Sequence, residues 1–180
     1  MSRIGRLPIA IPAGVEVTLG DNNTVTVKKG KNVLVKSFDA KMSIEVKDGH
    51  VYVSRPNDAK AVKALHGLTR VLIANMIKGV NEGFKKTLVL NGVSYKAVQK
   101  GNGVTLFVGY SHPIDIMPLE GAVITVKSPT EVEVSGIDKE VVGQTAANIK
   151  AVRIPDPYHL YGIRYSDEVL VKKEGKSATK

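Results

Sequence analysis

The sequence predicts an α+β protein of two similar domains, each a mostly antiparallel sheet covered by one helix, followed by an extended basic C-terminal tail. Both halves of the chain contain short segments in which apolar and polar residues alternate, separated by turn residues, as in half-buried strands. Each series of segments ends in one amphipathic stretch with helical spacing. We therefore expect domains at residues 1–82 and 83–152, with the tail at residues 153–180.

The first domain is expected to begin with an antiparallel meander. Its alternating segments lie between residues 15 and 55 and read VEVTL, TVTVK, NVLVKSF, MSIEV and HVYVSR. Asp48-Gly49, which precedes the last segment, is a typical two-residue hairpin turn. We expect one sheet with one apolar face.

A helix is expected to cover that face. It should begin at Asn57 or Asp58 and end near Gly79, because glycine commonly follows the last helical turn. Apolar residues at helical spacing predict the side that packs on the sheet. They are Ala61, Leu65, Leu68, Leu72 and Met76.

The second domain repeats this order of elements. Its strand segments, between residues 86 and 135, read KTLVLN, VSYKAV, VTLFVGY, IDIM, AVITVK and EVEVS. Asp138 is expected to cap a second helix, with Val142, Ala146, Ile149 and Val152 facing inward. LHGLTRVLI (65–73) and VVGQTAANI (141–149) share a glycine, a threonine and an isoleucine in register, which indicates a duplication.

Composition excludes several classes of function. The chain has no cysteine, so disulfides, thiolate metal sites and cysteine nucleophiles are excluded. No apolar run reaches the roughly eighteen residues needed to cross a bilayer, so we expect no membrane association. The four histidines lack the paired spacing of metal ligands, and GNGVTLFVG (101–109) is typical of a hairpin turn rather than a phosphate loop. We expect no metal and no cofactor.

The charge balance predicts a polyanionic partner. There are 26 Lys and Arg residues against 17 Asp and Glu, a formal net charge of +9. No acidic residue lies between Glu82 and Asp115, and this stretch is expected to present an RNA-binding edge through Lys85, Lys86, Lys96 and Lys100. The segment VKKGKNVLVK (27–36) holds four further lysines and is compatible with either a solvated hairpin or a phosphate contact.

The tail predicts contact with irregular RNA. PDPYHLYGIRY (155–165) contains two prolines, which remove backbone donors and favour extended neighbours, so we expect neither a helix nor a regular strand there. Cations bind phosphates and aromatic rings stack on unpaired bases. The tail interleaves both, in Arg153, Tyr158, His159, Tyr161, Arg164, Tyr165, Lys172 and Lys173. A terminal strap packed on the second domain is the alternative, and the two interpretations are compatible.

Two other functions fit parts of the sequence. Asp156, His159, Asp167 and Glu168 are residue types that a small hydrolase uses for acid-base catalysis. No partner nucleophile is indicated, so turn residues and solvated charges are the favoured interpretation, and we expect no enzyme. A free-standing RNA chaperone would share the basic charge and the aromatic tail.

Three separated blocks carry a resemblance to a known family. They are MSRIGRLPIAIPAGVEV at the start, ALHGLTRVLIANMIKGVNEGF in the first helix, and RIPDPYHLYGIRYSDEVLVKKEG in the tail. In this order they resemble the bacterial large-subunit ribosomal protein six family over essentially the whole chain. The resemblance implies two duplicated α+β domains, a basic extension and a location in the cytoplasm, in the ribosome.

The resemblance also implies a structural, non-catalytic function. It implies that the protein binds large-subunit ribosomal RNA near the base of the stalk and the region where translation factors dock. The implied partners are this RNA and neighbouring ribosomal proteins near the stalk base, with no membrane and no small-molecule substrate. Much of the RNA contact is expected in the second domain and the tail.

The tail departs from the family pattern at three positions. The family signature reads roughly proline, acid, proline, tyrosine, lysine, glycine, lysine, glycine, and it falls on residues 155–162. His159 and Tyr161 replace the two lysines, and Leu160 replaces a glycine. Because a tyrosine cannot neutralise a phosphate, we expect this tail to use stacking where the family pattern uses charge.

Overall fold

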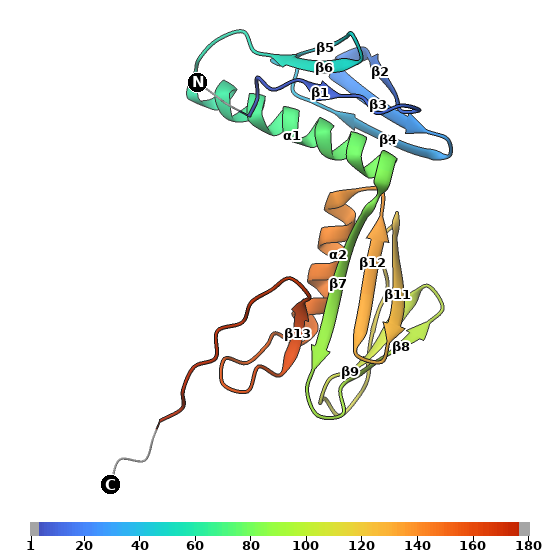
Figure 1. Ribbon diagram of the computed structural model, residues 1–180, viewed down its shortest axis with the longest axis vertical. Helices are drawn as coiled ribbons and strands as arrows, with labels where there is room; N and C mark the ends of the chain where they lie inside the picture. The colour runs from blue at the N-terminus through green and yellow to red at the C-terminus, as the bar shows by residue number, and fades with distance from the viewer. Residues whose placement is uncertain (1–3, 177–180) are drawn as a thin grey trace. The chain divides into compact units, whose positions relative to one another are not determined.

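The computed structural model describes residues 4–176 and is an α+β protein with antiparallel sheets and two long helices (Figure 1). The chain divides into two compact units. One comprises Met1–Gly83 with Ile137–Lys139, and the other comprises Phe84–Gly136 with Glu140–Lys180. Neither helix in the described part of the chain is long and apolar enough to cross a membrane.

The first unit contains two three-stranded sheets rather than the single sheet that the sequence predicts. One sheet has the order β2-β3-β4, with β2 at Glu16–Gly20, β3 at Thr24–Lys29 and β4 at Asn32–Ser37. The other has the order β1-β6-β5, with β1 at Ile9–Ala10, β5 at Ser43–Lys47 and β6 at His50–Ser54. Each predicted strand segment overlaps an observed strand. The chain leaves the meander after β4 and forms a separate hairpin.

Helix α1, at Lys60–Glu82, packs on these sheets along a face that matches the predicted one only in part (Figure 1). The predicted positions Ala61 and Leu68 are exposed. Met76 is buried as predicted, and Leu65 packs against the core. The other buried residues lie one position further along than the predicted ones and include two polar side chains, at Val62, His66, Thr69, Ile73, Ile77 and Val80. Hydropathy alone therefore identifies only part of the buried face, because His66 and Thr69 are buried polar residues.

The end of α1 also differs from the prediction. Gly79 is buried inside the helix, and the helix continues to Glu82. Gly83 follows with φ 77°, and its N–H donates to the Gly79 carbonyl. The glycine that ends the helix is therefore the one with a positive φ, which residues with a Cβ rarely adopt.

The second unit contains a four-stranded and a three-stranded antiparallel sheet. The larger has the order β11-β12-β7-β13, with β7 at Phe84–Asn91, β11 at Ala122–Ser128, β12 at Glu131–Gly136 and β13 at Gly162–Tyr165. The smaller has the order β10-β9-β8, with β8 at Lys96–Lys100, β9 at Gly103–Phe107 and β10 at Ile114–Ile116.

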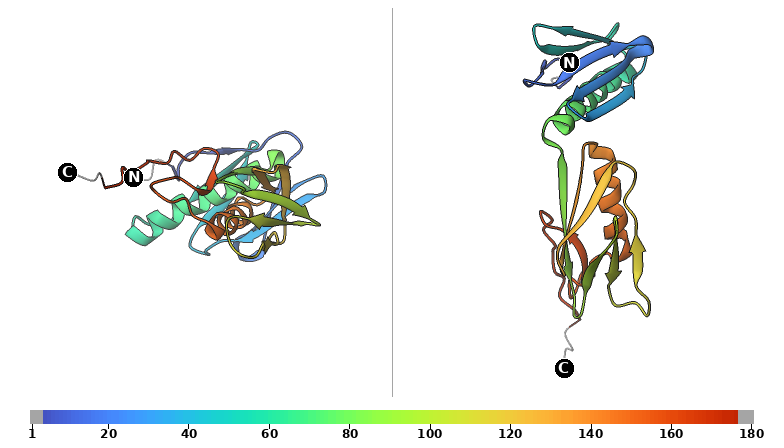
Figure 2. Two further views of the ribbon diagram at one scale, coloured as in Figure 1. Left: turned by 90° about the horizontal axis from the view of Figure 1, so that it is seen from below. Right: turned by 90° about the vertical axis from the view of Figure 1, so that its right-hand side faces the viewer.

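Helix α2, at Lys139–Val152, lies against one face of the larger sheet (Figure 2). Val142, Ala146 and Ile149 are buried as predicted and share a core with Leu88 and Leu90 of β7. Here the apolar periodicity identifies the correct face, because apolar side chains occupy most of the buried positions.

Strand β13 contradicts the prediction that residues 155–165 form no regular strand. Gly162–Tyr165 pair antiparallel with β7, with Ile163 opposite Leu90 and Arg164 opposite Val89. Ile163 is fully buried in the core of the second unit. The two prolines, at positions 155 and 157, come before the strand and remove no hydrogen bond from it. Part of the predicted tail is thus a strand of the second unit.

We predict that Gly162→Ala destabilises the second unit. Gly162 has φ 154°, and a Cβ there would lie 2.5 Å from the Pro155 nitrogen and 2.6 Å from its Cα, both rigid backbone atoms. The overlap should lower the free energy of unfolding by about 1–3 kcal/mol, measured by urea denaturation of the full chain.

Gly143→Ala is the matched control. Gly143 lies on α2, and a Cβ added there would meet no atom within 4 Å apart from its chain neighbours and the adjacent helix backbone, so alanine should raise the free energy of unfolding by about 0.5–1 kcal/mol. Equal stability of the two variants would contradict the close approach at Gly162.

Candidate RNA interface

The loop before β13 is organised by the Asp156 side chain. Its carboxylate accepts hydrogen bonds from the N–H of Tyr158 at 2.7 Å and of His159 at 3.1 Å. The Leu160 N–H donates to the Asp156 carbonyl at 3.0 Å, and the Asp156 N–H donates to the Tyr161 carbonyl at 3.1 Å. These bonds close residues 156–161 into a compact turn.

The same bonds keep Asp156 ionised. The Tyr158 N–H lowers the pKa of the Asp156 carboxyl, and the His159 N–H adds to this effect. A carboxyl whose pKa is lower in the folded state stabilises that state above its unfolded pKa of about 3.9. This contribution is lost as the pH falls through the lower folded-state pKa. At neutral pH the ionised Asp156 therefore contributes its full stabilisation of the folded state.

The turn presents aromatic side chains to solvent. The rings of His159 and Tyr161 are stacked, with centroids 5.6 Å apart and planes at 22°. Tyr158 is 49% exposed and Tyr161 is 41% exposed, so neither forms part of a core. Tyr165, by contrast, packs against the core of the second unit. The strap interpretation therefore describes Tyr165, whereas Tyr158 and Tyr161 are available to a partner.

Lysines of the last described segment lie beside these rings. An open groove of about 720 Å³ lies at this place. It is lined by Tyr158, His159, Lys172, Lys173, Glu174 and Gly175. The Lys173 N–H donates to the Pro157 carbonyl at 2.8 Å, which holds the segment next to the turn. The groove thus combines aromatic surface with two exposed ammonium groups.

Glu168 anchors the chain after β13 to α2. Its carboxylate accepts hydrogen bonds from Lys150 Nζ at 2.6 and 2.8 Å and from the Tyr165 N–H at 3.1 Å. The Lys150 ammonium lowers the pKa of Glu168, which remains charged. Arg164 Nη1 donates to the carbonyls of Tyr165 and Glu168 at 3.4 and 3.3 Å, so this guanidinium helps to hold the same bend.

Two of the four lysines from the stretch without acidic residues form ion pairs in the structure. Lys86 Nζ lies 3.0 Å from Asp167 Oδ2, and Lys100 Nζ lies 2.5 Å from Asp115 Oδ2. Each lysine lowers the pKa of its aspartate partner. The sequence does not indicate these ion pairs, because the acids come from segments that only the fold brings near, and the RNA contact of the four lysines stays a prediction.

The remaining predicted site residues have separate surroundings. Lys85 is exposed on β7, and Lys96 Nζ lies 4.9 Å from the centre of the Phe107 ring. The Arg153 guanidinium lies 5.1 Å from the centre of the Tyr110 ring, and Tyr110 raises the pKa of Arg153. The structure therefore gathers Tyr158, His159, Tyr161, Lys172 and Lys173 at one place and distributes the other predicted residues over the second unit.

Lys150 and Tyr110 were not among the predicted site residues. Lys150 Nζ lies 4.9 Å from the centre of the Tyr165 ring, and Lys86 Nζ lies 5.3 Å from it. The Tyr110 hydroxyl donates to the Val152 carbonyl at 3.0 Å, next to Arg153. No local pattern marks either residue, because both contacts join segments that are distant in the sequence.

The four residues of the hydrolase interpretation have structural partners. Asp156 caps the turn, Asp167 pairs with Lys86, and Glu168 pairs with Lys150. His159 Nδ1 lies 3.6 Å from Asp156 Oδ2 on the surface. Within residues 4–176, no three His, Cys, Asp or Glu side chains form a group that could hold a metal ion.

Comparison with known proteins identifies the family. Residues 11–83 and 91–166 match the family model described as ribosomal protein L6. The chain belongs to the ribosomal protein L6 family. Three relatives carry the name large ribosomal subunit protein uL6. That of Thermoanaerobacter sp. is 53% identical and that of Clostridium botulinum strain Eklund 17B is 51% identical, each over all of both chains, while that of Fusobacterium nucleatum is 48% identical over 99% of this chain and 100% of its own.

Membership of the L6 family confirms the resemblance of the three sequence blocks. It also confirms that the protein is a ribosomal structural component of the cytoplasm and not an enzyme, which rules out the hydrolase interpretation. The match covers both units, in agreement with two similar L6 domains.

Leu160, which stands where the resemblance implies a glycine, has a strained backbone conformation. Its φ is 64°, a left-handed geometry that costs roughly 1–2 kcal/mol in a residue with a Cβ. Its carbonyl accepts a hydrogen bond from Asn91 Nδ2 at 2.9 Å, which holds it in place. We expect Leu160→Gly to raise the free energy of unfolding by up to about 1 kcal/mol, after the greater entropy of unfolded glycine is subtracted.

Leu119→Gly is the control for this experiment. Leu119 is also partly exposed, and its φ is not among the positive values of the described residues. Glycine there relieves no strain and should lower the free energy of unfolding. A loss of stability in Leu160→Gly as large as that in Leu119→Gly would show that position 160 carries no strain.

Proposed function

We propose that this L6-family protein is a structural constituent of the large ribosomal subunit and binds ribosomal RNA near the base of the stalk and the translation-factor docking region. The names of its relatives support the subunit. The observation that carries the RNA contact is the exposed His159–Tyr161 stack on a fixed turn beside Lys172 and Lys173.

The turn suits unpaired RNA for a physical reason. An aromatic face stacks on a base of any sequence, and stacking contributes about 1–3 kcal/mol per base. Asp156 and the pairing of β13 hold the rings in position before RNA arrives, so little conformational entropy is lost on binding. The net charge of +9 supplies the attraction to a polyanion.

The proposed contact residues contribute unequally. Tyr158, His159 and Tyr161 supply stacking surface, and Lys172, Lys173 and Lys85 supply exposed charge. Lys86 and Lys100 contribute less, because a carboxylate already neutralises each ammonium. Arg153, Arg164, Tyr165 and Lys96 are half-buried or packed on rings, and they position the surface as much as they contact RNA.

A free-standing RNA chaperone would use the same chemistry, and membership of the L6 family disfavours it. Both proteins would bind RNA through charge and stacking, but only a ribosomal constituent would stay attached to neighbouring ribosomal proteins and RNA at the stalk base. The location of the protein in the cell, on ribosomal subunits or free of them, therefore distinguishes a ribosomal constituent from a chaperone.

We predict that the full chain sediments with large ribosomal subunits at physiological salt. The measurement is a sucrose-gradient profile of a cell lysate, with the protein detected in each fraction. A chaperone would appear in light fractions, because it leaves its RNA after folding. Recovery of the chain in light fractions alone would exclude the ribosomal function.

We predict that Tyr161→Ala weakens binding to large-subunit RNA by about 1–3 kcal/mol without changing the salt dependence. Tyr161 carries no charge, so its loss releases no counterion. Tyr52→Ala is the control, since Tyr52 is 42% exposed and lies beside His50 in the first unit, with ring centroids 6.3 Å apart. Affinities should be measured by filter binding at several salt concentrations. Equal effects of the two substitutions would show that Tyr161 does not stack on RNA.

A further inference from the structure

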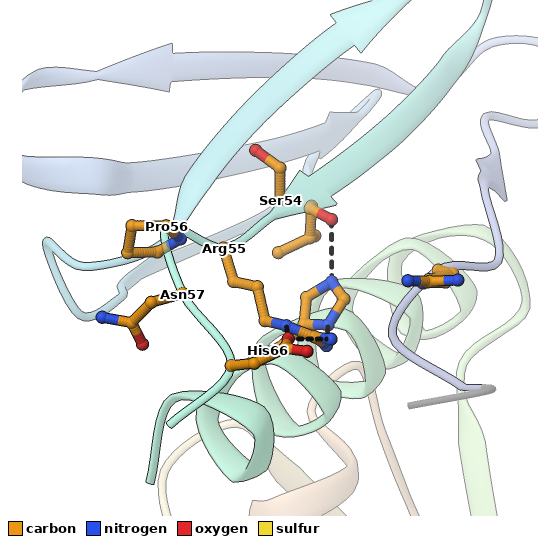
Figure 3. Close-up of a pocket in the computed structure, with 8 residues that line it drawn as sticks. Ser54, Arg55, Pro56, Asn57 and His66 are labelled. Atoms are coloured by element: carbon orange, nitrogen blue, oxygen red, sulfur yellow. Dashed lines mark hydrogen bonds and ion pairs between the residues drawn. The ribbon is translucent and has the colours of Figure 1, made fainter. Parts of the chain in front are cut away.

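The first unit contains a polar notch where β6 leads into α1 (Figure 3). Its volume is about 420 Å³. The polar residues that line it come from the N-terminal segment, the end of β6, the loop between β6 and α1, and α1 itself. They are Arg6, Ser54, Arg55, Asn57, Asp58 and His66.

Arg55 is held in one orientation inside this notch. Its Nε and Nη2 donate to Asp58 Oδ1 at 3.0 and 2.7 Å, and its Nη1 donates to His66 Nδ1 at 2.9 Å (Figure 3). His66 is buried, and its Nε2 donates to the Val53 carbonyl at 2.8 Å, so its Nδ1 is free to accept. The Arg55 side chain is only 9% exposed. The guanidinium plane is thus fixed by protein contacts alone.

Arg55 keeps donors that these contacts do not use. A guanidinium has five N–H groups, and the bonds to Asp58 and His66 use three of them, which leaves two. Asn57 Oδ1 accepts the Ala59 N–H at 3.2 Å, so the amide NH₂ of Asn57 is also available on the wall of the notch.

The charge of the notch is positive. Arg6 and Arg55 bring two positive charges, and Asp58 brings one negative charge that it shares with Lys63, whose Nζ is 3.8 Å away. Arg6 lines the notch, and it makes no hydrogen bond or ion pair with any residue between positions 4 and 176. An exposed arginine and a fixed arginine therefore line the same notch.

We propose that this notch binds one phosphate group of an RNA backbone, with Arg55 as the fixed donor and Arg6 as the second cation. The planar donor fork of a guanidinium matches the oxygens of a phosphate, and two arginines offset the nearby carboxylate. The site goes beyond the proposed function, which places RNA contacts in the second unit. The proposal rests on that function in one respect, namely that the phosphate belongs to RNA.

The first test is the salt dependence of binding by the full chain to transcribed large-subunit RNA. Arg6→Gln should reduce the slope of log affinity against log salt by about 0.7–0.9, the value for one lost phosphate contact. Arg6→Lys should retain the slope because it retains the charge. Lys41→Gln is the control, since Lys41 is an exposed cation of the same unit that does not line the notch. An unchanged slope in Arg6→Gln would overturn the proposal.

The second test observes the site without RNA. The ¹⁵Nε resonance of Arg55 should shift when inorganic phosphate is added to the folded protein, and not when chloride is added to the same ionic strength. Arg6→Gln should reduce that shift while leaving the melting temperature unchanged, because Arg6 holds no other residue in the described chain. A phosphate shift equal to the chloride shift would overturn the site.

These results separate the notch from the proposed function. If the wild-type chain fails to bind large-subunit RNA, the proposed function is wrong, while a phosphate-specific shift at Arg55 would still support the anion site. If the wild type binds RNA and Arg6→Gln binds with the same slope, the notch is not an RNA contact. Binding of an acidic peptide to the notch in place of phosphate would likewise count against the proposal.

Discussion

The pairing of β13 with β7 is the interaction on which the candidate site depends. Four backbone positions join the chain end to the four-stranded sheet, and burial of Ile163 stabilises the join. The aromatic side chains of residues 155–161 lie on the segment that joins the end of α2 to this strand. Without β13, the aromatic residues would sit on a flexible peptide, and each would lose conformational entropy on binding.

Two carboxylates determine the shape of the segment around β13. Asp156 closes the turn before the strand, and Glu168 binds Lys150 of α2 after it. Both are acidic residues in a basic segment, where an unpaired carboxylate would weaken the attraction to a polyanion. In the structure, one carboxylate is bound to backbone N–H groups and the other to an ammonium, so they order the chain while the unpaired lysines remain available.

Stacking and charge are divided between different parts of the second unit. The exposed rings of His159 and Tyr161 stand where the resemblance implies two lysines, while Lys86 and Lys100 are partly neutralised by aspartates. The proposed interface therefore relies less on charge than its count of basic residues suggests. The fixed Arg55 in the first unit follows the same principle, since its partners set its orientation before any anion binds.

Local sequence patterns determined most of the elements, because alternation and helical spacing are properties of neighbouring residues. Each predicted strand segment overlaps a strand, the inward face of α2 was identified, and three sequence blocks were enough to indicate the family. The tertiary structure decided the rest. The buried face of α1 depends on partners for His66, β13 depends on the free edge of β7, and the lysine pairs depend on acids from distant segments. These features arise from contacts between residues far apart in the chain, and no local pattern records them.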